Sequence, residues 1–174
     1  MEQIDTMYPD NKTEMYKLLL AQLKVMLEGE EDIIANLSNT SALLNQALKD
    51  INWVGFYLMK KGSLILGPFQ GKIACIHIPI GKGVCGTAVK LGKIQVVKDV
   101  HEFPGHIACD SASNSEIVIP MKKNGTILGV LDIDSPKIHR FDEVDAKYLD
   151  QLVTLVVEHC NWSSCVQYDF LVRI

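Results

Sequence analysis

The sequence predicts one α+β domain built around an antiparallel sheet. Two observations lead to this fold class: the helical patterns lie mainly at the two ends of the chain, and strand patterns fill most of the middle. Within that middle region, residues 116–122 and 126–133 flank Asn124-Gly125, a dipeptide typical of a tight hairpin turn. Because strands joined by a hairpin run in opposite directions, at least part of the sheet is antiparallel.

Two helices are expected before the sheet. The first should cover residues 14–28, because residues 10–13 (Asp-Asn-Lys-Thr) offer capping side chains and apolar residues recur at helical spacing. Its apolar face is wide, which indicates burial between two surfaces, such as the sheet and a partner subunit. The second helix should cover residues 32–49. The polar residues 38–41 could break it in two, because their side chains compete for backbone hydrogen bonds.

Residues 52–59 predict a strand with two different faces. A period of two places Trp53, Gly55 and Tyr57 on one face, and apolar side chains suited to packing against helices on the other. Trp and Tyr rings each have a polar end that needs a hydrogen-bond partner when it is buried. The Trp/Tyr face is therefore an unusual one for a simple core.

The rest of the chain alternates short elements and turns. Residues 98–114 form a long polar stretch without a sustained period, and loops of this length in compact domains are often functional. The other expected elements, in chain order, are a strand at 63–66, a turn at 67–68, a strand at 72–78, a short helix at 84–91, an edge strand at 93–97 and a closing helix from 141.

Composition narrows the class of protein. The chain of 174 residues is 48% hydrophobic and 22% charged, which suits one globular core without disulfide staples. Its net charge of −4 argues against a nucleic-acid partner. No apolar run is long enough to span a membrane, and the N-terminus does not resemble a signal peptide. Five cysteines without an export signal predict thiols in a reducing compartment, and hence a cytoplasmic protein.

A glycine-rich turn stands at residues 81–86 (Gly-Lys-Gly-Val-Cys-Gly). The spacing matches a dinucleotide-binding fingerprint, but an antiparallel hairpin follows where such a fold needs repeated parallel crossovers. A dinucleotide site is therefore disfavoured. Glycines that open a short helix still expose backbone N–H groups, which can seat a carboxylate or a phosphate.

The cysteines differ in their surroundings. Cys109 lies in the polar loop and not in an apolar stripe, which favours a chemical role, whereas Cys160 is placed like a core residue and Cys165 is uninformative. The spacings of Cys75, Cys85 and Cys109 contain no Cys-x2-Cys pair, so no metal is predicted despite nearby histidines at positions 77, 101 and 106.

An acidic pair ends the predicted hairpin. Asp132 and Asp134 flank Ile133, so both carboxylates face the same side of the strand, and Glu116 at the end of the long loop can join them. Close carboxylates raise one another's pKa, so one can hold a proton while a neighbour binds an ammonium. With the thiols and the aromatic face, these groups predict a pocket for a small zwitterion that has an apolar side chain and is attacked by a thiol.

Six segments, in order and at similar spacing, carry a resemblance to a known family. The chain resembles the free methionine-(R)-sulfoxide reductases, which are single GAF-domain enzymes, from about residue 14 to residue 160. The segments are residues 52–57 (NWVGFY), 66–75 (LGPFQGKIAC), 81–88 (GKGVCGTA), 103–110 (FPGHIACD), 115–120 (SEIVIP) and 129–134 (GVLDID).

This resemblance implies an architecture. It implies a six-stranded antiparallel GAF sheet with helices packed mainly on one face, and usually a homodimer. The GAF domain would occupy residues 1–160, with N-terminal helices at 14–49, the sheet and active-site loops at 52–134 and a C-terminal helix at 141–160. The tail at 161–174 has no assigned role.

The resemblance also implies the chemistry and the residues that perform it. The reaction is reduction of free methionine-(R)-sulfoxide, with no bound cofactor and with thioredoxin, NADPH and thioredoxin reductase as the source of electrons. Cys109 would attack the sulfoxide, Cys75 would resolve the resulting sulfenic acid as a disulfide, and Cys85 would be a third redox cysteine. The implied substrate-binding residues are Trp53, Tyr57, Glu116, Asp132 and Asp134.

Two other functions stay open at this point. A sensory GAF module would bind a small ligand without turnover, although the sequence shows no output domain and a sensor needs no cluster of thiols. Zinc-dependent hydrolysis would require metal that is retained on purification and lost on cysteine substitution.

Overall fold

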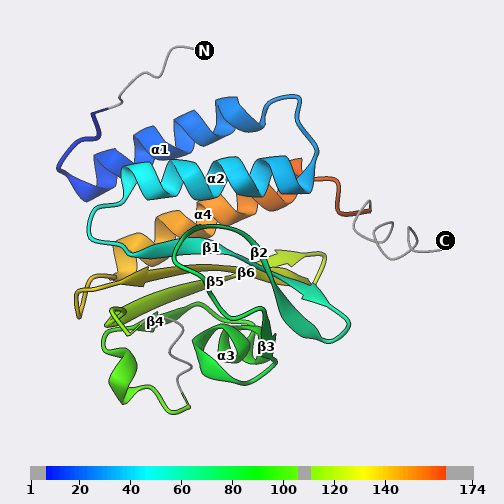
Figure 1. Cartoon of the computed structure of the whole chain (residues 1–174). Helices are drawn as coiled ribbons and strands as arrows, with labels where there is room; N and C mark the ends of the chain where they lie inside the picture. Colours follow the sequence, from blue (N-terminus) through cyan, green and yellow to red (C-terminus); the bar gives the residue numbers. More distant parts are fainter. Residues whose placement is uncertain (1–6, 106–110, 164–174) are drawn as a thin grey trace.

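A six-stranded antiparallel sheet forms the centre of the computed structural model, which describes residues 7–105 and 111–163. The strand order is β3-β2-β1-β6-β5-β4, as expected for the predicted fold class (Figure 1). No helix among the described residues is long and apolar enough to cross a membrane. The elements are α1 (Lys12–Leu27), α2 (Ile33–Ala47), β1 (Trp53–Lys60), β2 (Ser63–Gly71), β3 (His77–Pro79), α3 (Gly83–Leu91), β4 (Gln95–Val97), the 3₁₀ turn η1 (Val100–Glu102), β5 (Ser115–Lys123), β6 (Thr126–Ser135) and α4 (Glu143–His159).

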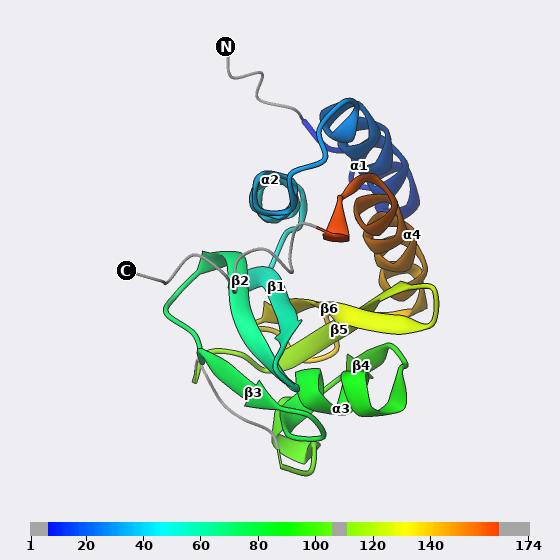
Figure 2. The same cartoon turned by 90° about the vertical axis from the view of Figure 1, so that its right-hand side faces the viewer.

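Helices α1, α2 and α4 cover one face of the sheet, and α3 covers the other (Figure 2). Helix α2 packs against β1 and β2, and α4 packs against β5. Helix α1 has α2 and α4 as its main neighbours, so its wide apolar face meets two helices and not the sheet that was expected. Strand alternation divides the interior into two cores: Val54, Phe56 and Ile133 face the three helices, and Trp53 and Tyr57 face α3.

Side-chain caps explain where the first two helices begin. The Asn11 side chain accepts a hydrogen bond from the N–H of Glu14, and the Asp32 side chain accepts one from Ala35. Helix α2 does not break at residues 38–41. The hydroxyls of Ser38, Thr40 and Ser41 donate to carbonyls four residues earlier, so these side chains are satisfied within the helix.

Two strand boundaries differ from the sequence prediction. The expected turn at Gly67-Pro68 is wrong, because β2 continues through it; the register with β1 shifts at this point, where a proline costs no ladder hydrogen bond. The expected strand at 72–78 shortens to β3. Cys75 therefore lies in the connection between β2 and β3, and not in a strand.

A buried carboxylate, Asp145, joins α1 to α4. Its side chain is fully buried, accepts a hydrogen bond from the Tyr16 hydroxyl at 2.7 Å, and forms ion pairs with Lys12 at 2.7 Å and Arg140 at 3.4 Å. It also closes a capping box with Asp142 at the start of α4. These contacts connect segments about 130 residues apart in the sequence.

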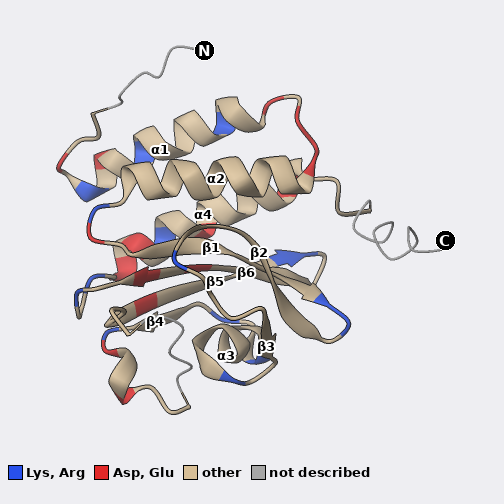
Figure 3. Ribbon diagram, in the orientation of Figure 1, with Lys and Arg blue, Asp and Glu red and all other residues tan. Residues whose placement is uncertain are grey.

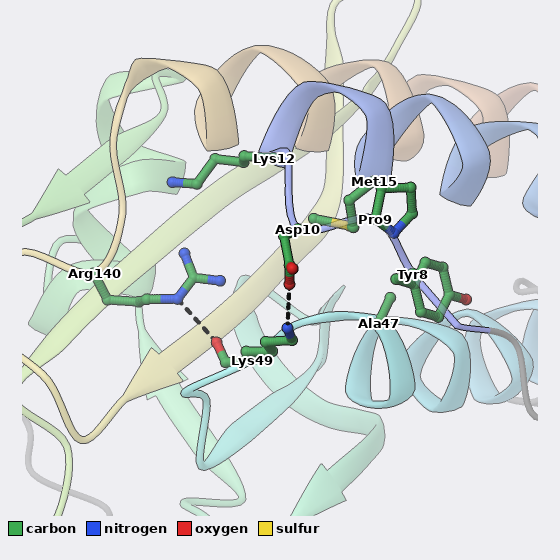
Figure 4. Close-up of a pocket in the computed structure, with 8 residues that line it drawn as sticks. All are labelled: Tyr8, Pro9, Asp10, Lys12, Met15, Ala47, Lys49 and Arg140. Carbon is green, nitrogen blue, oxygen red and sulfur yellow. Dashed lines mark hydrogen bonds and ion pairs between the residues drawn. The ribbon is translucent and has the colours of Figure 1, made fainter.

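A shallow pocket lies beside this carboxylate, between α1, α2 and the segment before α4 (Figure 4). Lys12, Lys49 and Arg140 bring three cations to it, and all of them already have partners. Lys49 pairs with Asp10 at 2.9 Å, and Arg140 also donates to the carbonyl of Lys49 at 2.9 Å. The pocket is therefore explained by the packing of the helix layer.

We expect Asp145→Ala to destabilise the protein by about 3 kcal/mol, because it removes one side of a buried charge network and leaves the Tyr16 hydroxyl without its acceptor. Urea denaturation measures the change. Asp150→Ala, an exposed position on the same helix, is the matched control and should change stability by less than about 0.5 kcal/mol. Equal effects of the two substitutions would show that Asp145 does not hold the helix layer together.

Candidate active site

Strand register gathers polar side chains on the face of the sheet covered by α3. Asp134 in β6 pairs with Trp53 in β1 on one side and with Glu116 in β5 on the other. Two residues earlier in β6, Asp132 pairs with Gly55 of β1. Paired residues point to the same face of a sheet, so the structure brings together the three carboxyls and the tryptophan that the sequence singled out.

Helix α3 places Cys85 over these carboxyls. The buried thiol donates to Glu116 Oε1, with the sulfur 3.9 Å from the oxygen, and it also interacts with Asp132. Sequence spacing gave no sign of this contact, because the helix reaches the carboxyls only through the fold of the sheet.

The glycine turn allows α3 to approach this closely. Gly81 and Gly83 have φ angles of +80° and +60°, a region that favours glycine. A β-carbon on Gly86 would collide with the carbonyl oxygen of Pro79. Two N–H groups of the turn are used internally: Gly81 donates to Gly86 and Lys82 donates to Pro79. The glycines of the turn therefore have a clear steric role. The predicted anion-binding site is limited to the first N–H groups of α3.

Burial controls the protonation of this cluster. Glu116 is 6% exposed and Asp132 is 7% exposed. Burial, followed by the nearby charges of Asp132 and Asp134, raises the pKa of Glu116 well above its usual range. Burial also raises the pKa of Asp132, to about 6, and that of the Cys85 thiol well above 9. At neutral pH the cluster therefore favours a protonated Glu116 and a neutral Cys85.

Asp132 keeps one unused acceptor. Its Oδ1 is buried and has no hydrogen-bond partner among the residues that the structure describes. Such atoms are rare in folded proteins and call for an explanation, often a ligand. The unused oxygen is available to accept a hydrogen bond from water or a ligand, or to contact a cation.

An aromatic wall borders the carboxyls. The Trp53 ring stacks on Phe69 with the ring centroids 5.3 Å apart, and on Tyr57 with the centroids 5.9 Å apart. Trp53 Nε1 donates to the carbonyl of Lys72 at 3.1 Å, and the Tyr57 hydroxyl donates to the carbonyl of Cys75 at 3.0 Å. The predicted need of both rings for polar partners is met by the β2–β3 connection, so the backbone of Cys75 lies against the Tyr57 hydroxyl.

Sequence reasoning missed two parts of this wall. Phe69 follows the turn expected at Gly67-Pro68, so the sequence predicts no strand and no ring contact at this position. Gly55 was noticed only as part of a face, but a β-carbon there would collide with Phe69 and lie 2.7 Å from the Trp53 ring. The alternation of β1 carried this signal, since a glycine between Trp53 and Tyr57 marks a close approach.

The cysteines differ in burial and in whether they form a disulfide. Cys75 is half-buried and takes part in a disulfide, whereas Cys85 and Cys160 are buried free thiols. Cys160 belongs to the core on the opposite side of the sheet, as predicted. Cys109, the predicted attacking residue, lies outside the described residues, as does Cys165.

Residues 113 and 114, at the end of the long loop, are hydrogen-bonded to positions next to the site residues. Ser113 accepts a hydrogen bond from the Asn52 side chain at 3.0 Å, and the N–H of Asn114 donates to the carbonyl of Ser135 at 2.7 Å. Asn52 and Ser135 immediately adjoin Trp53 and Asp134 in the chain. The loop therefore returns to the sheet next to the aromatic ring and the carboxyls.

Comparisons with known proteins agree with this fold and site. Residues 39–158 match the family model for the GAF domain. A free methionine-R-sulfoxide reductase from Escherichia coli (strain K12) is 56% identical over 143 residues, which cover 82% of this chain and 87% of that protein. The fold and the matched residues thus define a GAF-domain protein.

Two solved structures identify the family within the GAF-domain proteins. The reduced form of fRMsr from Staphylococcus aureus matches with a TM-score of 0.82 at 55% identity, covering 88% of this chain and 97% of that one. The free methionine-R-sulfoxide reductase from Neisseria meningitidis, in complex with its substrate, matches with a TM-score of 0.87 at 42% identity, covering 94% and 97%. The chain belongs to the family of free methionine-R-sulfoxide reductases, and the resemblance drawn from its motifs is confirmed.

The buried carboxyls should make stability depend on pH. Because the folded state raises the pKa of Glu116 above its unfolded value, the folded protein binds more protons, and its free energy of unfolding should fall as pH rises from about 4.5 toward neutrality. Urea denaturation at several pH values should show this fall in the wild type and a clearly flatter dependence in Glu116→Gln. The exposed Glu158→Gln should keep the wild-type slope. An unchanged slope in Glu116→Gln would contradict the raised pKa.

Proposed function

We propose that this chain reduces free methionine-(R)-sulfoxide to methionine through cysteine thiols. The observation that supports this most is the row of buried carboxyls next to a tryptophan wall and below a thiol. Such a pocket suits a small zwitterion with an apolar side chain. Two relatives, at 56% and 46% identity, are named free methionine-R-sulfoxide reductase, and a structural neighbour of that name at 42% identity was solved with its substrate bound.

The pocket offers a partner for each part of the substrate. Asp134, half-buried at the rim, and the unused Oδ1 of Asp132 can accept hydrogen bonds from the substrate ammonium. The S-methyl group would lie against the Trp53 ring, held by Phe69 and Tyr57. The sulfoxide oxygen would then face Glu116, whose raised pKa keeps a proton available.

The proposed reaction moves two electrons from cysteine to the sulfoxide. The Cys109 thiolate attacks the sulfur, Glu116 protonates the oxygen, and the resulting hydroxyl passes to Cys109 as the sulfur of methionine regains its lone pair. Cys109 becomes a sulfenic acid and methionine leaves. The Cys75 thiol then attacks the sulfenic sulfur, which releases water and forms a disulfide.

Regeneration requires a dithiol donor, and thioredoxin is the donor that we propose. A thioredoxin thiolate attacks the disulfide, its second thiol resolves the mixed disulfide, and both cysteines return to thiols. The disulfide at Cys75 supports a redox role for this residue, and Tyr57 holds its backbone carbonyl beside the pocket. A homodimer is likewise proposed from family resemblance, and sedimentation of the purified chain tests it.

Cys85 fits a different task from the other two cysteines. A thiolate is the reactive form of cysteine, and burial beside two carboxyls raises the pKa of Cys85 and keeps it a thiol. Its role as a third redox cysteine stays a prediction. It would require the cluster to lose negative charge before Cys85 reacts.

The first experiment is a thioredoxin-coupled assay that follows NADPH consumption with three substrates: free R-sulfoxide, free S-sulfoxide and a sulfoxide-containing peptide. We expect turnover of the free R form: the proposed site binds a zwitterion, a methionine sulfoxide residue inside a peptide has no free α-ammonium, and the preference for the R epimer is proposed from the family resemblance. Absence of turnover on all three, with the thiols verified as reduced, would reject the reductase and favour a sensory module that only binds its ligand.

We expect Cys109→Ser to lower turnover by more than about 100-fold, because serine cannot replace the attacking thiolate. Cys160→Ser is the matched control and should keep wild-type turnover, since this thiol lies in the opposite core. A Cys109→Ser variant that turns over at the wild-type rate would show that another cysteine attacks the sulfoxide.

A further inference from the structure

Cys85, Glu116 and Asp132 form a compact set of possible metal ligands, here called the Cys-Glu-Asp cluster. Each residue offers one ligand atom, and these atoms all lie within 4.8 Å of one another. All three residues are buried, and they come from α3, β5 and β6, so their positions are fixed by packed elements and not by a loop.

A second observation points to a ligand. Asp132 is more than nine-tenths buried, and its Oδ1 has no hydrogen-bond partner within residues 7–105 and 111–163. A buried carboxylate oxygen without a partner is costly, and a cation beside it would remove that cost. The cluster thus combines a metal-type donor set with an unmet acceptor.

We propose that the Cys-Glu-Asp cluster binds Zn²⁺, and that zinc thereby blocks the pocket. Zinc accepts sulfur and carboxylate oxygen in a tetrahedral arrangement, whereas Mg²⁺ and Ca²⁺ prefer six or more oxygen ligands. A substrate ammonium explains the carboxylates but not the sulfur between them, because a neutral thiol is a weak acceptor. Zinc uses all three groups.

To bind zinc, the three ligand atoms must move only slightly closer to one another. Zinc–ligand bonds of about 2.0 to 2.3 Å separate tetrahedral ligand atoms by roughly 3.3 to 3.5 Å. Cys85 Sγ and Glu116 Oε1 are 3.9 Å apart. Because the three atoms lie within 4.8 Å of one another, side-chain rotations that shorten their separations by about 0.4 to 1.5 Å would bring them into range. A fourth position remains for water or a substrate atom.

Binding is a proton exchange without redox chemistry. Zinc replaces the proton of the Cys85 thiol and any proton held between Glu116 and Asp132, and these protons pass to solvent. The dication also removes the mutual repulsion of the cluster, so the bound form is more compact than the free one.

The binding test uses the full chain with Cys75 held in its disulfide, which removes that thiol from competition. Co²⁺, which reports thiolate ligation by a charge-transfer band, is titrated first, and Zn²⁺ then displaces it. We expect the band in the wild type and in Cys160→Ser, its loss in Cys85→Ser, and at least tenfold weaker Zn²⁺ binding in Asp132→Asn.

Two results would overturn the proposal. One is a Cys85→Ser protein that keeps the band and the wild-type stoichiometry; the other is a wild type that shows no band and does not bind Zn²⁺. Circular dichroism confirms that each variant is folded. Should Cys85→Ser fail to fold, Asp132→Asn decides, and wild-type affinity in that variant would reject the cluster.

Inhibition of turnover rests on the proposed function, but metal binding does not. If both hold, Zn²⁺ raises the apparent KM for free methionine-(R)-sulfoxide and leaves kcat unchanged at saturating substrate. Zinc binding without any sulfoxide turnover would support the cluster and reject the reductase. Sulfoxide turnover without zinc binding would support the reductase and reject the metal site. The failure of either proposal can therefore be told from the failure of the other.

Discussion

The central constraint in this structure is the burial of three ionisable groups between the sheet and the short helix α3: Cys85 on the helix, and Glu116 and Asp132 on the strands. Three negative charges cannot be held together in such a place without water, so the site keeps at least part of its charge neutralised by protons. The packing itself thus favours a bound proton on Glu116. This proton is the one that the proposed reaction would deliver to the sulfoxide oxygen.

The opposite face of the same strands packs into an apolar core, and this packing offsets the cost of burying the three groups. Ile117 adjoins Glu116, Ile133 adjoins both aspartates, and both isoleucines belong to the buried core that includes residues of α1, α2 and α4. The acidic positions of the site are the red segments on the central strands in Figure 3, and their side chains share the face of Trp53 on the α3 side of the sheet. The apolar core thus fixes the positions of the strands, and alternation transfers that rigidity to the site.

Much of this arrangement follows from alternation along single strands, and that part could be predicted. The shared face of Trp53 and Tyr57 and that of Asp132 and Asp134 both depend on a period of two. Residue types that usually end a strand or break a helix gave less reliable predictions. Pro68 was expected to end a strand, yet pairing with β1 absorbs it at a register shift; the polar middle of α2 was expected to break the helix, yet its hydroxyls bond within it.

The contact between Cys85 and Glu116 could not be read from the sequence, because it spans 31 residues and depends on how α3 lies across the sheet. The same is true of Phe69, whose role appears only when β2 is seen to continue past Pro68. In both cases the missing information was tertiary: which surface a short helix covers, and which neighbour a strand pairs with.

Gly55 limits how the aromatic wall can change. Its missing side chain lets Phe69 and Trp53 pack closely, so the spacing of the β1 and β2 backbones sets how these rings stack. Any larger residue at that position would push the rings apart. A different shape of this wall must therefore come from the ring residues or from the connection that contains Cys75, because Gly55 has no side chain that a substitution could shorten.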